Sequence, residues 1–335
     1  MNNQPLVCIC IPNYNNEKTI SETLDSLINQ TYKNIIIKIF DNASTDSSMK
    51  ILKGYESEYP NITVFQNATN IGGEANFTKC IEGLEGHFGA IYHADDLYDT
   101  KMVETQVNRL LQNNISAVFV RANLIDDDSN AIGEQFFPDE LKSKKFHQFN
   151  FEQLFKLILK YDNFLITPSV MAKTDIYKNK IQSWNGDVFK TSADLDVWLR
   201  FSEIEDIGII TDKLISYRMS TASFSYRTKF KRMVSRDMFL VIDFYLSKYK
   251  HINFDLADYK YLKFKDNIIV VTNKIINHKD VDYQSIQVLN FKILTKVFFS
   301  LQKFKIYCYG SILKLLLLLK LRNILYKLVK SVNQI

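Results

Sequence analysis

The sequence predicts an α/β fold, in which a mostly parallel sheet is flanked by helices and followed by a helical C-terminal extension. Short apolar runs alternate with segments of helical periodicity up to about residue 228. Strands and helices that alternate at this spacing form right-handed crossovers and therefore parallel strands. Beyond residue 228 the pattern is helical only. We expect one α/β domain over residues 1–228, with halves at 1–97 and 98–228, and a helical region over residues 229–335.

The expected elements follow one another in a regular order. Apolar runs typical of buried strands occupy residues 6–11, 35–40, 62–65, 89–93, 117–121, 167–171 and 214–219. Apolar residues at helical spacing predict helices over residues 19–30, 47–58, 100–112, 151–161 and 190–202, and another from residue 74. Residues 126–150 are polar and charged, and we expect an irregular excursion there.

Polar loops follow four of the predicted strands, at residues 12–16, 41–46, 70–73 and 95–96. Because the carboxyl ends of parallel strands meet at one edge of a sheet, all four loops should lie along one rim. The last loop places Asp95 and Asp96 side by side. Two adjacent carboxylates repel each other unless a divalent cation lies between them and an anion. The sequence therefore predicts a cation site that faces an anionic ligand.

The basic charge is concentrated at the C-terminus. The net charge is +5, yet no Asp or Glu follows Asp282. Such a tail suits an anionic surface, and nucleic acid is not expected because no nucleic-acid-binding signature accompanies the charge. Within residues 306–335, one helical face carries Leu317, Leu321, Ile324 and Leu328. This pattern indicates a basic amphipathic helix that lies on an anionic bilayer, or else a helix packed on the protein body with a solvated basic face.

The cysteines and the N-terminus indicate a cytoplasmic protein. We expect Cys8 and Cys10 to point to opposite faces of a strand and to act as small buried hydrophobes in a reducing compartment. The first residues lack the basic start and apolar core of a signal peptide. No stretch reaches the ~18 uncharged apolar residues of a membrane span. A peripheral position on the inner face of the cell membrane follows if the tail binds lipid.

Several short motifs occur in an order that resembles family 2 glycosyltransferases. The resemblance covers residues 5–220 and rests on the segments VCICIPNYN at 7–15, SLINQTY at 26–32, DNASTD at 41–46, NIG at 70–72, NF at 76–77, ADD at 94–96 and DLDVWLR at 194–200. It implies a GT-A fold, with a nucleotide-sugar-binding half fused to an acceptor half. It also implies transfer of a sugar with inversion at the anomeric carbon.

The resemblance further implies which residues bind the donor. Tyr14 would stack on the nucleotide base, and Asp41 would accept hydrogen bonds from the base or ribose, although a loop or capping role is the alternative for each. Asp95 would ligate Mn²⁺ or Mg²⁺, with Asp96 as the second carboxylate of the metal site. Arg218 would contact the diphosphate, or else form a surface ion pair. The full implied set is Pro12, Tyr14, Asn15, Glu17, Asp41, Asn70, Gly72, His93, Ala94, Asp95 and Arg218.

The sequence departs from the family pattern in two places. His93 stands where relatives often have an Asp, so it contacts the sugar, the ribose or the metal, or is a plain histidine at the end of a strand. Many relatives also carry an Arg near Ala75 and Asn76. A cationic contact to the diphosphate is therefore missing there, or is supplied by another residue.

Asp194 is the catalytic base that the resemblance implies, with a helix-capping role as its alternative. An inverting transfer is a single in-line displacement, so the acceptor hydroxyl must lose its proton as it attacks. Asp194 precedes a helix that continues with Asp196, Trp198 and Arg200. Asp196 is the alternative base, and we expect Trp198 to pack in the core.

Together these expectations describe a metal-dependent inverting glycosyltransferase. Its donor would be a nucleotide-diphosphate sugar, with a UDP-sugar favoured, and its acceptor a glycan hydroxyl of a lipid-linked bacterial polysaccharide intermediate. Two other classes compete with this function. A sugar nucleotidyltransferase needs a Gly-rich loop with Arg and Lys after the first strand, which residues 12–15 do not provide. A non-catalytic membrane-associated binding protein would not need both Asp95 and Asp194.

Overall fold

The computed structural model describes residues 4–219, 232–287, 289, 294–295 and 300–332. They form two compact units, one of Met1–Phe155 with Asn163–Ser220 and one of Lys156–Asp162 with Thr221–Ile335. Each unit has its own hydrophobic core. The boundary predicted at residue 228 lies outside the described residues.

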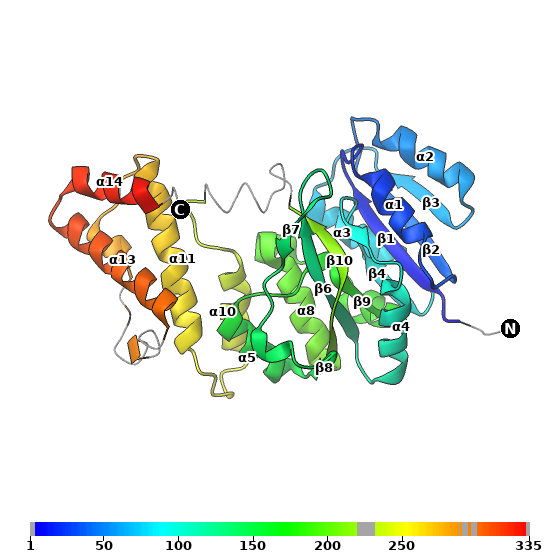
Figure 1. The fold of residues 1–335 in the computed structure, drawn as a ribbon. Coiled ribbons are helices and arrows are strands. Elements are labelled where there is room, and N and C mark those ends of the chain that lie inside the picture. The colour runs from blue at the N-terminus through cyan, green and yellow to red at the C-terminus, as the bar shows by residue number, and fades with distance from the viewer. Residues whose placement is uncertain (1–3, 220–231, 288, 290–293, 296–299, 333–335) are drawn as a thin grey trace. The chain divides into compact units, whose positions relative to one another are not determined.

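The first unit is built on one ten-stranded sheet (Figure 1). Eight strands lie in the order β3-β2-β1-β4-β9-β6-β10-β5, while β7 pairs with β6 and β8 pairs with β10. Parallel pairing joins β1 (Val7–Asn13), β2 (Ile35–Asp41), β3 (Ile62–Gln66) and β4 (Phe88–Ile91), and separately β6 (Ala117–Ile125) and β10 (Ile207–Arg218). Antiparallel pairing adds β5 (Leu97–Tyr98), β7 (Ala131–Glu134), β8 (Phe146–Phe149) and β9 (Val170–Lys173).

The predicted α/β fold, with a central sheet flanked by helices, is confirmed. The sheet is more mixed than expected, because β9 inserts between β4 and β6 and runs antiparallel to both. The segment 126–150 was expected to be irregular but contributes β7 and β8. All four residues of β7 are exposed, so this strand has no apolar alternation by which the sequence could reveal it.

Helices cover both faces of the parallel part of the sheet. On one face, α1 (Ile20–Ile28), α2 (Ser48–Glu58) and α4 (Met102–Gln112) join the sheet in a single apolar cluster. On the other face lies α3 (Gly73–Gly83), whose last carbonyl accepts a hydrogen bond of 2.9 Å from Lys38 Nζ. The remaining helices of this unit are α6 (Thr174–Ile176), α7 (Gly186–Phe189) and α8 (Ala193–Ile204), with short turns η1 (Asp139–Leu141), η2 (Thr167–Ser169), η3 (Tyr177–Ile181) and η4 (Lys190–Ser192). Helix α5 (Phe151–Tyr161) begins in the first unit, and its residues from Lys156 onward belong to the second.

The first two cysteines share a face of β1, next to α3. The Sγ atoms of Cys8 and Cys10 are 3.9 Å apart, and both residues are fully buried. The expectation that they point to opposite faces was wrong, because side chains alternate along a strand and residues i and i+2 therefore lie on the same side. Their burial as free thiols agrees with the predicted role as small hydrophobes.

The second unit is helical. Its elements are α10 (Met238–Lys248), α11 (Ala257–Ile276), η5 (Tyr283–Ser285), α13 (Leu301–Leu318) and α14 (Arg322–Val332). An apolar core joins α11, α13 and α14 through side chains that include Phe264, Ile268, Leu313, Leu325 and Val329. None of the helices in the described part of the chain has the length and apolar character needed to cross a bilayer.

The tail therefore differs from the predicted single helix. A break after Leu318 divides it into α13 and α14. Leu317 and Leu328 pack against the helical core, whereas Leu321 and Ile324 are exposed. The four leucine and isoleucine positions of the predicted face are thus split between the core and the surface.

We predict that Trp198→Ala lowers the free energy of unfolding by about 3–5 kcal/mol, because the indole is fully buried against Phe119 at 5.1 Å between ring centroids. Urea denaturation followed by the fluorescence of Trp184 measures this loss. The exposed Leu111→Ala should change stability by less than about 0.5 kcal/mol. Equal effects of the two substitutions would contradict a packing role for Trp198.

Candidate active site

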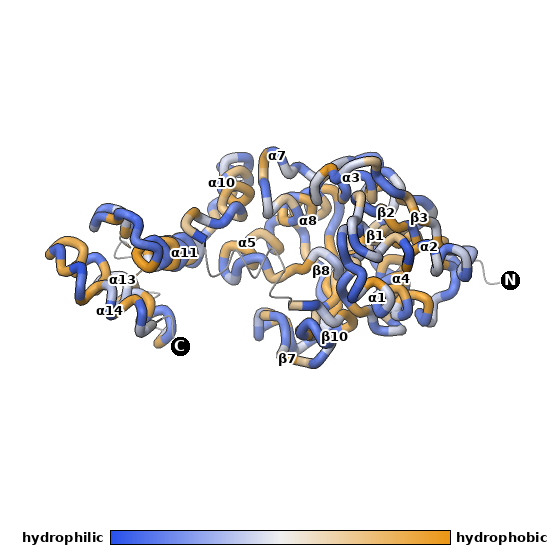
Figure 2. The backbone as a smooth tube through the Cα atoms, turned by 90° about the horizontal axis from the view of Figure 1, so that it is seen from above, coloured by the Kyte–Doolittle hydropathy of each residue, from blue (hydrophilic) through white to orange (hydrophobic). Residues whose placement is uncertain are grey.

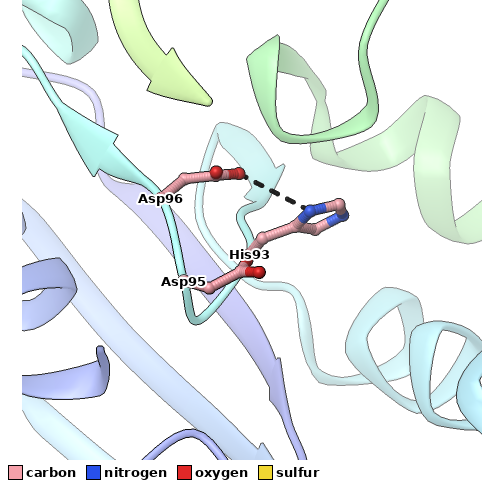
Figure 3. Close-up of side chains that lie close together, drawn as sticks. All are labelled: His93, Asp95 and Asp96. Atoms are coloured by element: carbon pink, nitrogen blue, oxygen red, sulfur yellow. Dashed lines mark ion pairs between the residues drawn. The ribbon is translucent and has the colours of Figure 1, made fainter. Parts of the chain in front are cut away.

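Three side chains meet just beyond the carboxyl end of β4 (Figure 3). Ligand atoms of His93, Asp95 and Asp96 all lie within 4.8 Å of one another. Asp96 Oδ2 is 3.6 Å from His93 Nδ1. The sequence predicted the two carboxylates as a pair and named a metal contact as one possible role of His93, and the structure brings all three side chains together. Within the described ranges of the chain, no other cluster of this kind is found.

The carboxylate of Asp96 is buried and only half satisfied. Its Oδ1 accepts a hydrogen bond of 2.7 Å from the backbone N–H of Arg218, while Oδ2 has no hydrogen-bond partner. Burial raises the pKa of Asp96 well above its usual range, and the neighbouring charge of Asp95 adds to the rise. Burial also lowers the pKa of His93. Both shifts disfavour the charged forms in the absence of a compensating charge.

These residues fit the divalent cation that the sequence predicted. An unpartnered carboxylate oxygen in the interior is costly, and a cation there would supply both the missing contact and the opposite charge. Carboxylate oxygens are the protein ligands that Mg²⁺ and Mn²⁺ prefer. Asp95 and Asp96 would hold such an ion, with the imidazole of His93 as a neighbouring nitrogen ligand.

Arg218, the last residue of β10, is buried and donates hydrogen bonds to several segments around this cluster. Its side chain is 2% exposed. Its Nε donates to the carbonyl of Asp95 at 2.7 Å, and its terminal nitrogens donate to the carbonyls of Asp126 and Asp127 and to the side chains of Glu22 and Ser129. These contacts use all five N–H donors of the guanidinium.

The structure gives Arg218 an internal role that the sequence did not suggest, and its contact with a diphosphate stays a prediction. The ion pair with Glu22 involves a buried rather than a surface arginine. Arg218 fixes the loop that carries Asp95 and Asp96. Sequence analysis missed Glu22 as its partner, since nothing in a helical segment marks a contact with a residue so distant along the chain.

Asp41 is also more deeply placed than expected. It has no exposed surface, and it joins the ends of β1 and β2. Its Oδ1 accepts a hydrogen bond from Asn13 Nδ2 at 2.8 Å, and its Oδ2 accepts from the backbone N–H of Ser44 at 3.0 Å and from Gln66 Nε2 at 3.3 Å. In this structure the carboxylate organises the rim, and its contact with a base or ribose stays a prediction.

The first two polar loops hold each other in place. Asn15, at a positive φ of 55°, accepts a hydrogen bond of 2.8 Å from Thr45 N. Glu17 accepts one of 2.8 Å from Ser47 N, next to the start of α2. Tyr14, between these anchors, is 45% exposed. Among these loop residues Tyr14 is therefore the one whose side chain is available to stack on a base.

The third loop is fixed by amide side chains. Asn70 Oδ1 accepts hydrogen bonds of 2.9 Å from Gly72 N and from Asn42 Nδ2. Gly72 has a φ of +88°, which suits glycine, and leads into α3. Asn76, near which the resemblance implied an Arg in many relatives, is buried and donates to the carbonyl of Phe40 at 2.9 Å. The sequence missed Asn42, whose signal was only its place directly after Asp41.

The remaining residues implied by the resemblance, Pro12 and Ala94, lie at the same edge of the sheet. Pro12 pairs with Phe40 in the β1–β2 ladder, and its half-buried ring precedes the first loop. Ala94 is buried, and its carbonyl accepts a hydrogen bond of 3.2 Å from Thr19 Oγ1. The four polar loops thus follow β1, β2, β3 and β4, which are adjacent in the sheet, as the rim prediction required.

Asp194 lies in the first turn of α8 and is half-buried. Its carboxylate accepts hydrogen bonds from Leu195 N at 2.7 Å and Thr167 Oγ1 at 3.2 Å. Burial raises the pKa of Asp194 to about 6, and the two hydrogen bonds offset part of that rise. A carboxylate with a pKa close to neutrality, and still partly accessible, is suited to act as a general base.

The neighbouring residues of α8 are structural. Asp196 is 2% exposed, and its Oδ2 accepts hydrogen bonds of 2.9 Å from Arg200 Nε and from Asn185 Nδ2. This leaves the alternative base paired and inaccessible. The indole of Trp198 is fully buried, which confirms the predicted packing role.

A row of aromatic rings connects the acidic cluster with α8. The ring of His93 meets the edge of Phe77 at 5.7 Å, Phe77 stacks on Trp184 at 4.8 Å, and Trp184 meets Trp198 at 5.8 Å between centroids. The loop after β4, helix α3 and the segment before α7 are therefore packed into one framework with the helix that carries Asp194. The packing roles of Phe77 and Trp184 were not predicted, because Phe77 lies on α3 and Trp184 about a hundred residues later, and only the fold brings the two rings together.

Residues 8–172 match the family model described as glycosyl transferase family 2. The chain carries a glycosyl transferase family 2 domain. An Escherichia coli relative named UDP-Glc:alpha-D-GlcNAc-diphosphoundecaprenol beta-1,3-glucosyltransferase WfgD is 25% identical over 231 residues, which are 68% of this chain and 82% of the relative.

Solved structures agree on the fold of this chain. The Staphylococcus aureus protein TarS, residues 1–349 in complex with UDP-GlcNAc, has a TM-score of 0.57 at 15% identity, covering 98% of this chain and 92% of TarS. The mannosyltransferase PcManGT of Pyrobaculum calidifontis, in complex with GDP-Man and Mn²⁺, has a TM-score of 0.53 at 14% identity, covering 98% and 86%. The fold is of the GT-A type, as the resemblance implied.

We predict that Arg218→Lys lowers the free energy of unfolding by about 3 kcal/mol, because a lysine has three donors and leaves buried carbonyls and Glu22 unsatisfied. Urea denaturation followed by tryptophan fluorescence reports on the first unit, which holds both tryptophans. Arg322→Lys is the exposed control. Unchanged stability together with a raised KM for the donor would instead indicate a phosphate contact.

Proposed function

We propose that the protein is an inverting glycosyltransferase that moves one sugar from a nucleotide-diphosphate sugar to a hydroxyl of a glycan acceptor. The observation that carries this proposal is the half-buried Asp194 with its pKa near 6, on a helix joined to the acidic cluster by the aromatic row. The acidic cluster alone would serve a nucleotidyltransferase equally well. A separate carboxylate base is what transfer to a hydroxyl requires.

The reaction is a single displacement. Asp194 accepts the proton of the acceptor hydroxyl while the hydroxyl oxygen bonds to the anomeric carbon of the donor. The bond between that carbon and the diphosphate oxygen breaks at the same time, and the nucleoside diphosphate leaves with the electron pair. Attack from the side opposite to the leaving group inverts the configuration. A divalent cation held by Asp95 and Asp96 would neutralise charge on the departing diphosphate.

The donor is a UDP-sugar in this proposal. Tyr14 stacks on the base, and the turn of Asn70 and Gly72 approaches the diphosphate at the start of α3. Asp41 acts by holding the rim through Asn13 and Ser44. Support comes from the UDP-GlcNAc complex of TarS and from the UDP-Glc in the name of WfgD.

The acceptor is a lipid-linked polysaccharide intermediate at the inner face of the membrane. WfgD supports this choice, because its name specifies a sugar carried on diphosphoundecaprenol. A cavity of about 590 Å³ between α3 and residues 184–191 lies beside the aromatic row and is lined by Trp184, Thr78 and Thr191 together with carboxylates and lysines. Polar groups can hydrogen-bond to sugar hydroxyls, and an aromatic ring can pack against the apolar face of a sugar. We therefore assign the acceptor glycan to this cavity.

We predict that kcat/KM is constant above pH 7 and falls tenfold per pH unit below about pH 6, because Asp194 must be deprotonated to accept the proton. Asp194→Asn should lower kcat by about 100-fold or more. Release of UDP from UDP-glucose or UDP-N-acetylglucosamine, with an undecaprenyl-diphosphate-linked sugar as acceptor, measures both effects. Asp139→Asn, at a side chain that is 92% exposed and lies outside the proposed acceptor cavity, is the control. Wild-type turnover in Asp194→Asn, or release of pyrophosphate instead of UDP, would refute the mechanism.

We predict that EDTA abolishes UDP release and that Mn²⁺ or Mg²⁺ restores it. Asp95→Asn should weaken Mn²⁺-dependent UDP binding at least about tenfold, since one hard oxygen ligand is lost. Calorimetric titration of UDP with and without Mn²⁺ separates this effect from catalysis, because Asp194→Asn should bind UDP normally. The exposed Asp139→Asn is the matched control. Equal UDP affinity with and without metal in the wild type would count against a cation at this cluster.

A further inference from the structure

The turn between α13 and α14 exposes a compact group of apolar and basic side chains. All seven residues from 318 to 324 are exposed, and we call this segment the α13–α14 corner. Its four large apolar side chains are Leu318, Leu319, Leu321 and Ile324, with exposed fractions of 53%, 55%, 40% and 54%. Lys320 and Arg322 alternate with them. The apolar stripe continues along α13 through Leu315 and Ile312, and Figure 2 shows hydrophobic stretches in both helices.

Backbone hydrogen bonds fix the shape of the corner. Leu321 N donates to the carbonyl of Leu316 at 3.0 Å, and Lys320 N donates to that of Leu317 at 3.1 Å. Lys320 has a φ of 56°, so this is the Schellman arrangement that ends a helix. The apolar side chains are therefore displayed on an ordered turn, and they cannot fold back into the core without breaking these bonds.

The rest of α14 is anchored from the opposite side. Leu325 and Val329 are buried in the core that α11 and Leu313 complete. This anchoring uses the inward face of the helix and leaves the α13–α14 corner outside. Four large apolar residues within seven positions make a patch of the kind that soluble surfaces rarely leave uncovered.

The surroundings of the corner are basic. A cavity of about 580 Å³ between the end of α11 and α14 is lined by Lys279, Arg322 and Lys327, together with His278 and Asn323. Asp280 also lines it, and its carboxylate lies 4.0 Å from Arg322. Apart from Asp280, every charged side chain of this lining can carry positive charge. The charge is thus complementary to lipid phosphates.

We propose that the α13–α14 corner inserts its apolar side chains into the headgroup region of an anionic bilayer, while Arg322, Lys327 and Lys279 contact lipid phosphates. A basic rim around an apolar patch is the combination that holds a protein on such a membrane. A second copy of the chain fits less well, because a symmetric contact would place the same basic side chains against each other. The proposal specifies the surface for the membrane location proposed above.

Sedimentation with lipid vesicles tests the proposal on the full chain. Vesicles of one part phosphatidylglycerol to two parts phosphatidylcholine should bind the protein, and vesicles of phosphatidylcholine alone should bind it at least tenfold more weakly. The variant Leu318→Ser/Leu319→Ser/Ile324→Ser should lose at least tenfold in binding to the mixed vesicles. Arg322→Gln/Lys327→Gln should bind more weakly and show less dependence on salt, because fewer ionic contacts remain.

Leu111→Ser/Ile132→Ser is the matched control, since these exposed apolar residues lie in the first unit. It should bind vesicles as the wild type does, and unchanged thermal unfolding of all variants shows that they are folded. Failure of the wild type to bind, or wild-type binding by the α13–α14 corner variant, would overturn the proposal. A dimer in sedimentation equilibrium that the corner variant dissociates would overturn it in favour of a second copy. The assay contains no sugar donor, so this proposal and the proposed transfer reaction can fail separately.

Discussion

The buried guanidinium of Arg218 is the contact on which the geometry of the site depends. The guanidinium donates hydrogen bonds to Glu22 on helix α1 and to the carbonyl of Asp95, and so connects both to the end of β10. The backbone N–H of Arg218 donates to the carboxylate of Asp96. A buried charge is tolerated only where every donor has a fixed partner, so these elements cannot shift independently. The position of the two carboxylates is therefore set by a residue that itself has no exposed group to offer a ligand.

The rim of the sheet follows the same rule on a smaller scale. Loops at the ends of strands have no ladder partners, so their backbone groups must find side chains. Asp41 and Glu17 provide such hydrogen bonds to the backbone of Ser44 and Ser47, so these two side chains hold the rim whether or not they also contact a ligand. Tyr14 and Asp194 are candidate site residues whose side chains remain accessible to solvent.

The helical unit shows how one amphipathic segment can serve two purposes. Leu325 and Val329 satisfy the core, and the turn that precedes them displays a different set of apolar residues. A peripheral enzyme with a lipid-linked acceptor benefits from such a surface, because attachment to a membrane raises the local concentration of its acceptor. In the proposed attachment, membrane binding resides in the helical unit and the chemistry in the first unit, so each can be altered without the other.

The sequence by itself determined the alternating strands and helices, the four loops that follow adjacent strands, the acidic pair and the aspartate that opens α8. These features depend on residues that are close in the chain, and for such residues periodicity and turn-forming residue types predict the structure. The insertion of β9, the paired state of Arg218 and the choice of which tail leucines face outward were decided only by the tertiary structure. Arg218 and Glu22 are 196 residues apart, and no local pattern encodes a partner at that distance. Whether a polar side chain is buried depends on all the residues that pack around it. The sequence alone therefore does not show whether an Asp binds a ligand or supports the backbone.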